Sequence, residues 1–184
     1  MRFKTIITLL FTLLSVGVEA KTFKTIKNPV AMAHNIPGGE LKAREVVLAA
    51  DLIRSISAKY PGRYLMIDFW GMGCGPCRSA IQSSKDLRTK IAKRDDIKLV
   101  FIAEERIAGG SDAYKNYVAE WLADEETICI TNAEFARMQE LFQFNGIPHY
   151  ETFTPDCRRV RDDLRFNGYY NFDMYLKELK ERLK

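Results

Sequence analysis

Residues 66–78 read MIDFWGMGCGPCR and combine an apolar segment with a pair of closely spaced cysteines. Residues 66–70 are apolar except for Asp68, a pattern typical of a β-strand that is buried on both faces. Cys74 and Cys77 follow with two residues between them, so they can close a small disulfide ring. A helix that begins beside them would favour a thiolate at its N-terminus. The stretch therefore suggests thiol–disulfide exchange chemistry.

Outward from this stretch, strand-like and helix-like segments alternate along the chain. The apolar spacing predicts helices over residues 41–60, 77–93, 112–123, 133–142 and 172–183 and strands over 63–70, 97–103, 127–130 and 149–154, with 158–166 as the hairpin partner of the last strand. Asn132 is the predicted N-cap of the fourth helix. One helix separates the first two strands, so these strands should be parallel. The fold class is therefore α/β, with a mixed sheet between helical layers.

The first part of the chain differs in kind from the rest. Residues 1–20 carry an early positive charge, an apolar run over 6–18 and small residues before a cleavage site after Ala20, which predicts a secretory signal peptide. A retained membrane anchor is the alternative, although the run is short for a bilayer span of about 20 residues. Residues 21–40 are predicted to be an irregular leader and 41–184 one domain. This division predicts a periplasmic or otherwise extracytoplasmic protein.

Composition narrows the classes of partner. Across 184 residues, 28 Lys and Arg are interleaved with 24 Asp and Glu, for a net charge of +4, so nucleic acid is a poor candidate. A zinc site would need a second pair of closely spaced ligands, but Cys129 and Cys157 are 28 positions apart. We therefore expect no metal and no cofactor. Whether Cys129 and Cys157 pair is open, with the balance slightly against a bridge.

Three short motifs together resemble the thioredoxin superfamily: DFW at 68–70, CGPC at 74–77 and FNGIP at 144–148. The resemblance covers roughly residues 41–184. The long insertion between the second strand and Gly146 is similar to that of the exported TlpA-like branch, whose members are bacterial extracytoplasmic thiol–disulfide oxidoreductases. The resemblance implies a thioredoxin-like three-layer sandwich with a TlpA-like insertion.

The motif and the resemblance assign roles around the cysteine pair. Cys74, just before the helix, is the predicted attacking thiol, with a pKa that such a motif can lower to about 7. Cys77, one turn inside the helix, is the predicted resolving thiol of the redox disulfide. Gly75 permits a tight turn and Pro76 suits the first helical turn. A structural disulfide is the alternative reading of the pair.

The third predicted catalytic residue is Asp68. A carboxyl group on a buried strand is costly unless it is paired or protonated. The resemblance implies that Asp68 takes the proton from Cys77. The alternative is that Asp68 points to the surface at a strand edge.

The predicted substrate-binding residues are Trp70, Gly75, Pro76, Ile147 and Pro148. The family match implies a cis peptide bond between Ile147 and Pro148, which would expose the Ile147 backbone to an extended substrate strand. An ordinary trans turn is the alternative. Trp70 is equally compatible with a place in the core.

Three further residues draw attention. His149 either lies near the thiols or is an ordinary surface histidine. Tyr169 and Tyr170 are compatible with a surface patch.

These observations support three hypotheses. The first is an extracytoplasmic enzyme that reduces disulfides in envelope proteins. A membrane thiol relay as its electron donor is implied by the resemblance. The second is a redox-inert adaptor or binding module with the same fold. The third is a disulfide isomerase or oxidase.

Overall fold

The computed structural model describes residues 43–106, 109–160 and 166–183, with side chains from residue 50 onward. The predicted signal peptide (1–20) and leader (21–40) lie outside the described residues. Within the described residues, no helix is both long and apolar enough to cross a membrane.

Four strands form one sheet in the order β3-β2-β1-β4. They are β1 (Tyr64–Gly71), β2 (Ile97–Glu105), β3 (Glu126–Thr131) and β4 (His149–Phe153). β1 runs parallel to β2, and β2 runs parallel to β3, whereas β4 is antiparallel to β1. The predicted mixed sheet with a parallel first pair is confirmed.

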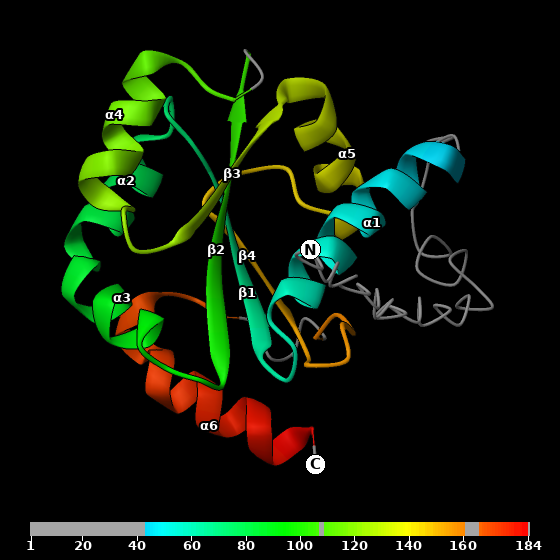
Figure 1. Ribbon diagram of the computed structural model, residues 1–184, viewed down its shortest axis with the longest axis vertical. Coiled ribbons are helices and arrows are strands. Elements are labelled where there is room, and N and C mark those ends of the chain that lie inside the picture. Colours follow the sequence, from blue (N-terminus) through cyan, green and yellow to red (C-terminus); the bar gives the residue numbers. More distant parts are fainter. Residues whose placement is uncertain (1–42, 107–108, 161–165, 184) are drawn as a thin grey trace, which may run out of the picture.

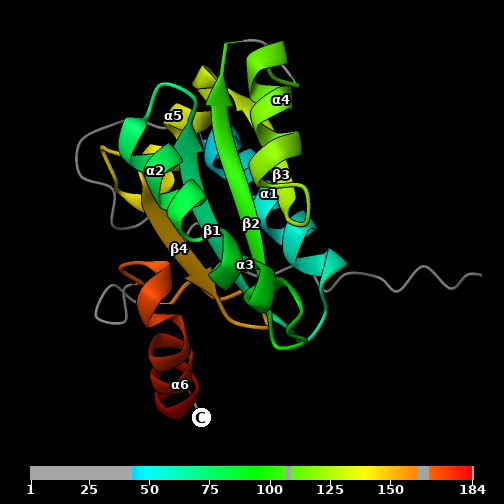
Figure 2. The same ribbon diagram turned by 90° about the vertical axis from the view of Figure 1, so that its left-hand side faces the viewer.

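Helices cover both faces of this sheet (Figure 1). The helices are α1 (Ala43–Lys59), α2 (Gly75–Ser83), α3 (Lys85–Ala92), α4 (Asp112–Trp121), α5 (Asn132–Phe142) and α6 (Phe172–Arg182). Figure 2 shows α2 and α3 in front of the sheet and α1 and α5 behind it. The predicted arrangement of three layers is confirmed.

Alternation along β1 divides the core in two, because successive side chains of a strand point to opposite faces. Leu65, Ile67 and Phe69 face α1 and α5. Met66 and Trp70 lie on the other face, in a cluster with buried side chains of α2, α3, α4 and α6. Asp68 lies between these two residues in the strand, so its side chain enters this second cluster.

The predicted helix over 77–93 is instead two helices that meet at Ser84. Ser84 has φ −96° and ψ 6°, outside the helical range. Its hydroxyl group donates to the carbonyl oxygen of Ala80 at 2.7 Å and accepts from Arg88 Nε at 3.2 Å. A serine side chain that bonds the preceding turn competes with the backbone ladder and bends a helix. Periodicity alone does not reveal this break.

The N-cap of α5 is Thr131, not the predicted Asn132. The Thr131 hydroxyl accepts from the Glu134 amide at 3.3 Å, and the Glu134 carboxylate accepts from the Thr131 amide at 2.8 Å. This reciprocal pair is a capping box. It gives hydrogen-bond acceptors to two backbone N–H groups, whereas an Asn132 side chain alone would give an acceptor to one.

The predicted hairpin partner at 158–166 is reduced to a single bridge between Arg159 and Phe153 among the described residues. Residues 161–165 lie outside the described part. Pro155 and the left-handed Cys157 (φ 60°) stand in the connection, which turns the chain away from a regular ladder.

Candidate active site

Cys74 and Cys77 form a disulfide at the N-terminus of α2, as predicted. Cys74 is half-buried, whereas Cys77 is 1% exposed. The Cys74 sulfur caps the helix: the backbone N–H of Cys77 lies 3.1 Å from it. A helix N-terminus stabilises negative charge, so a thiolate on Cys74 would gain both this contact and the helix dipole.

The residues inside the ring begin the helix and lie on the surface. Gly75 and Pro76 are both exposed. Proline is suited to the first turn because its missing N–H would have no intrahelical partner there. The Arg78 amide closes the first turn onto the Cys74 carbonyl at 3.1 Å. A substrate can therefore contact Cys74 at the surface, whereas Cys77 is buried inside the first turn of the helix.

The Ile147–Pro148 peptide bond is cis, as the resemblance implies. The Ile147 carbonyl oxygen lies 3.5 Å from Cys74 Sγ, so residues that are 73 positions apart in the chain meet at one point. Gly71 also packs against this segment, since a Cβ built on it would lie 3.4 Å from Ile147 Cδ1 and 3.2 Å from Glu104 Cγ. The cysteine pair and the cis-proline segment therefore form one site.

Asp68 is buried at 3% exposure, so the surface alternative is wrong. Its Oδ2 accepts a hydrogen bond from the Tyr169 hydroxyl at 2.7 Å. Its Oδ1 has no hydrogen-bond partner among the described residues. Asp68 lies on the face of β1 whose core cluster includes Cys77.

Burial raises the pKa of Asp68 to about 7. The hydrogen bond from Tyr169 and the positive charge of Arg88 act in the opposite direction. A group that titrates near neutral pH on the face of the sheet whose core cluster contains Cys77 can accept and return a proton.

This pKa has a consequence for stability. Below the ordinary Asp pKa of 3.8 the carboxyl group is protonated in both the folded and the unfolded state. Between that value and about 7 only the unfolded state ionises, so the free energy of unfolding falls as the pH rises. We expect the Asp68→Asn variant to be more stable than the wild type by about 4 kcal/mol at pH 8 and to lose this advantage toward pH 4. Urea unfolding at both pH values measures it, and an equal difference at both would contradict an ionised, buried carboxylate.

Trp70 lies in the core cluster that contains Cys77 and does not reach the surface. It is completely buried, and its ring lies 5.8 Å from that of Tyr114 and 5.4 Å from that of Tyr117. The alternative reading of Trp70 as a core residue is correct, so we leave it out of the proposed substrate-binding set.

His149 follows the cis-proline but belongs to the opposite face of the sheet. It pairs with Phe69 across β1 and β4, stacks on Phe144 with ring centroids 4.0 Å apart, and lies 2.8 Å from Glu151 Oε1. A place near the thiols on the face of Asp68 is therefore excluded for this side chain, and it is not a surface histidine either.

Cys129 and Cys157 are separate, partly buried thiols, as slightly favoured by the sequence. Within the described part of the chain, no three or more His, Cys, Asp or Glu side chains are grouped as metal ligands.

Sequence reasoning missed two side chains that act on Asp68. Tyr169 does not share a surface patch with Tyr170, because Tyr169 is 3% exposed and Tyr170 is 74% exposed. Arg88 is completely buried, although it lies in a helix whose pattern indicates an exposed charge. A buried carboxyl group needs a hydrogen-bond donor, so the sequence does indicate that Asp68 has one. It does not indicate which residue this is, because Tyr169 lies 101 positions away in the chain.

Comparisons with known proteins bear on the fold. No protein-family profile and no curated protein sequence matches this chain. Among solved structures, it is similar to a thiol-disulfide oxidoreductase from Bacteroides vulgatus (23% identity, 69% of this chain and 78% of the other, TM-score 0.53). It is also similar to the thioredoxin domain of another oxidoreductase from B. vulgatus (18% identity, 65% and 82%, TM-score 0.52). A thiol:disulfide interchange protein of the thioredoxin family from Chlorobium tepidum is a third (20% identity, 66% and 83%, TM-score 0.50). The chain therefore has the thioredoxin-like fold that its motifs predicted.

Proposed function

We propose that this protein is an extracytoplasmic thiol–disulfide oxidoreductase that reduces disulfides in envelope proteins through Cys74 and Cys77. One observation carries the proposal: the two cysteines form a disulfide in which Cys74 is accessible at a helix N-terminus and Cys77 is buried. Thiol–disulfide exchange needs this asymmetry between an attacking and a resolving thiol. The names of the structures to which the chain is similar agree with this chemistry.

The reaction consumes the reduced, dithiol form of the protein. The Cys74 thiolate attacks one sulfur of the substrate disulfide, which forms a mixed disulfide and releases the first substrate thiolate. Cys77 then attacks Cys74 Sγ, which closes the Cys74–Cys77 bond and releases the second substrate thiolate. The proton of the Cys77 thiol passes to Asp68. The substrate gains two electrons and the protein loses two.

The substrate would lie along the cis-proline segment. The backbone of Ile147 is next to Cys74, and Gly75, Pro76 and Pro148 lie around it. An extended peptide can pair with an exposed backbone segment in the manner of an added strand. We infer that the substrate is recognised mainly through its main chain, with its disulfide over Cys74.

Location and electron supply belong to the same proposal. The predicted signal peptide, cut after Ala20, supports an extracytoplasmic protein. Outside the cytosol, a disulfide persists once it forms. Each catalytic cycle therefore needs a dithiol partner to reduce the Cys74–Cys77 bond, and a membrane thiol relay could supply those electrons from the cytosol.

The proposal is tested by adding the protein to insulin and dithiothreitol. The rate at which insulin is reduced is measured as turbidity, because reduced insulin precipitates. We expect the wild-type protein to accelerate this reduction and the Cys74→Ser variant not to, because the attacking thiol is lost. The Cys157→Ser variant is the control, because Cys157 is unpaired and packs in the core on the α1 and α5 side. Equal rates for the wild type and Cys74→Ser would favour the redox-inert adaptor.

The equilibrium potential of the Cys74–Cys77 couple separates a reductant from an oxidant or isomerase. A value near about −270 mV supports a reductant, whereas one near about −120 mV supports an oxidant. The potential is measured by equilibration with glutathione or dithiothreitol buffers.

A further inference from the structure

The hydroxyl group of Tyr169 donates a hydrogen bond of 2.7 Å to Oδ2 of Asp68. Both residues are 3% exposed, so the hydroxyl does not compete with bulk water for this acceptor. The other carboxyl oxygen, Oδ1, has no partner in the described part of the chain. Oδ2 of Asp68 is therefore fixed by a hydrogen bond, whereas Oδ1 can still accept one.

The local fold places Tyr169 in the core next to the exposed Tyr170. Gly168 has φ +145°, a conformation that residues with a Cβ rarely adopt. It leads into a short 3-10 helix over Tyr169–Asn171. The Tyr169 ring packs edge-on against Phe166, with centroids 5.5 Å apart.

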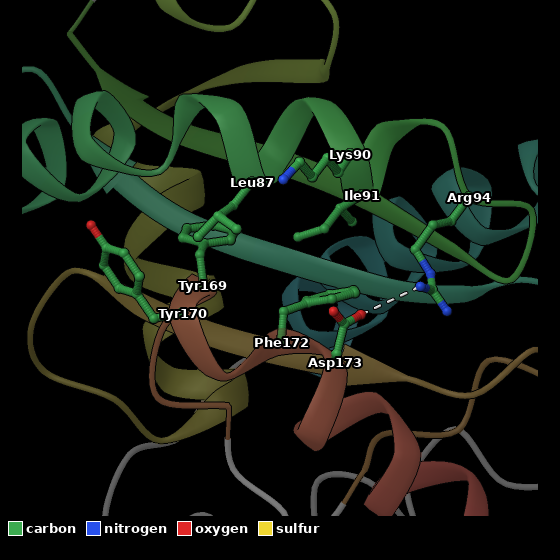
Figure 3. Close-up of a pocket in the computed structure, with 8 residues that line it drawn as sticks. All are labelled: Leu87, Lys90, Ile91, Arg94, Tyr169, Tyr170, Phe172 and Asp173. Atoms are coloured by element: carbon green, nitrogen blue, oxygen red, sulfur yellow. Dashed lines mark hydrogen bonds and ion pairs between the residues drawn. The ribbon is translucent and has the colours of Figure 1, made fainter.

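The outer side of Tyr169 borders a surface hollow of about 150 Å³ between α3 and the start of α6. Figure 3 shows Tyr169 beside Leu87 on the wall of this hollow, with Tyr170 turned away from the other lining side chains. The ring is therefore fixed between the packing of this wall and the hydrogen bond to Asp68.

Three neighbours act electrostatically on the Asp68 carboxyl group. They come from three elements: Tyr169 from the 3-10 helix, Tyr150 from β4 and Arg88 from α3. Cys77 of α2 belongs to the core cluster on the same face of β1 as Asp68, and it can titrate only once the Cys74–Cys77 disulfide is reduced. The bond from Tyr169 lowers the pKa of Asp68 and so favours its ionised form. Burial, followed by the charge of Asp68 and the same hydrogen bond, raises the pKa of Tyr169 well above its ordinary value, so Tyr169 acts as a donor throughout the working pH range.

We propose that Tyr169 is a positioning residue for the resolution step, holding Oδ2 of Asp68 so that Oδ1 of the carboxylate receives the proton of the Cys77 thiol. This inference rests on the proposed function. In this role Tyr169 itself exchanges no proton. It fixes the orientation of the carboxyl group and maintains its ionised fraction near neutral pH.

The Tyr169→Phe variant removes only the hydroxyl group. We expect the resolution step to slow roughly fivefold at pH 7 and to approach the wild-type rate above about pH 9, because loss of a hydrogen bond to a charged group moves the profile by about one pH unit. The step is measured by stopped flow as the second phase of thiol release when the reduced protein meets a peptide disulfide. The first phase, attack by Cys74, should keep its rate.

Tyr175→Phe is the matched control. The Tyr175 hydroxyl is also buried and donates to Thr152 Oγ1 at 2.7 Å, but it makes no contact with Asp68 in the described structure. We expect a comparable loss of stability and an unchanged pH profile. A wild-type profile in a folded Tyr169→Phe variant would overturn the inference.

Two further measurements keep the outcomes distinct. If Tyr169→Phe does not fold, the ¹³C resonances of Tyr169 Cζ and Asp68 Cγ in the wild type should titrate with one midpoint, and separate midpoints would overturn the inference. The Asp68→Asn variant tests the proposed function instead. If it resolves mixed disulfides as fast as the wild type at every pH, the proton acceptor itself is wrongly assigned, whatever Tyr169 does.

Discussion

A Cys77→Ala variant should remain bound to its substrate through a mixed disulfide on Cys74. Cys74 is accessible and at a helix N-terminus, so the first attack does not require its partner. The second step, which resolves the mixed disulfide, does require Cys77. Cys77 is held one helical turn from Cys74 and attacks it as an intramolecular group. Well-oriented intramolecular groups reach effective concentrations of about 10⁵ M or more. We therefore expect multiple-turnover reduction to fall by more than about 100-fold.

The adduct is measured by intact-protein mass spectrometry after mixing the reduced variant with a peptide disulfide, in the absence of small thiols. One peptide chain should be attached per protein, and a reductant should release it. The same variant in an envelope extract would then identify the physiological substrates by their adducts.

The Cys74→Ala/Cys77→Ala double variant is the control for this trap. It keeps Cys129 and Cys157, which are unpaired in the structure. It should form no adduct. An adduct of similar yield in the double variant would show that another cysteine reacts, and would contradict the assignment of Cys74 as the nucleophile.

The part of the site that the sequence predicted is the part that is encoded locally. A strand with apolar residues on both faces, followed by a cysteine pair that starts a helix, is readable in one short segment. The cis bond before Pro148 is predicted by the resemblance and not by the residues themselves, because only a few per cent of X–Pro bonds are cis. The capping of α5 shows the limit of local reading, because Thr131 and Asn132 are both acceptable caps and only the reciprocal bond to Glu134 decides between them.

The parts that were missed depend on contacts between distant segments. Asp68 could be recognised as an unusual buried carboxyl group, but its donor, Tyr169, is fixed only by how the segment before α6 packs against the sheet. The break at Ser84 likewise reflects a bond from Arg88 and the burial of both side chains. A charged residue in a helical pattern normally indicates a solvent-exposed side chain, so the sequence does not indicate that Arg88 is buried.

The buried Arg88 guanidinium group has four hydrogen-bond partners. Its Nη2 donates to the carbonyl oxygens of Trp121 at 2.8 Å and Ile81 at 3.0 Å, and its Nε donates to Ser84 at 3.2 Å. Its Nη1 pairs with Glu125, and the two side chains are 1% and 5% exposed. The guanidinium group therefore joins α2, α3 and the end of α4 at the layer that carries the cysteine pair.

We expect Arg88→Met to lower the free energy of unfolding by about 3 to 5 kcal/mol, because it leaves the Glu125 carboxylate buried without its counter-charge. Adding Glu125→Gln should recover part of this loss by removing that orphaned charge. Urea unfolding measures both, with Arg158→Met as the control. Arg158 pairs with Asp156 at exposures of 73% and 60%, so its loss should cost about 0.5 kcal/mol or less. If Arg88→Met and Arg158→Met lower the free energy of unfolding equally, the buried network around Arg88 does not stabilise this layer.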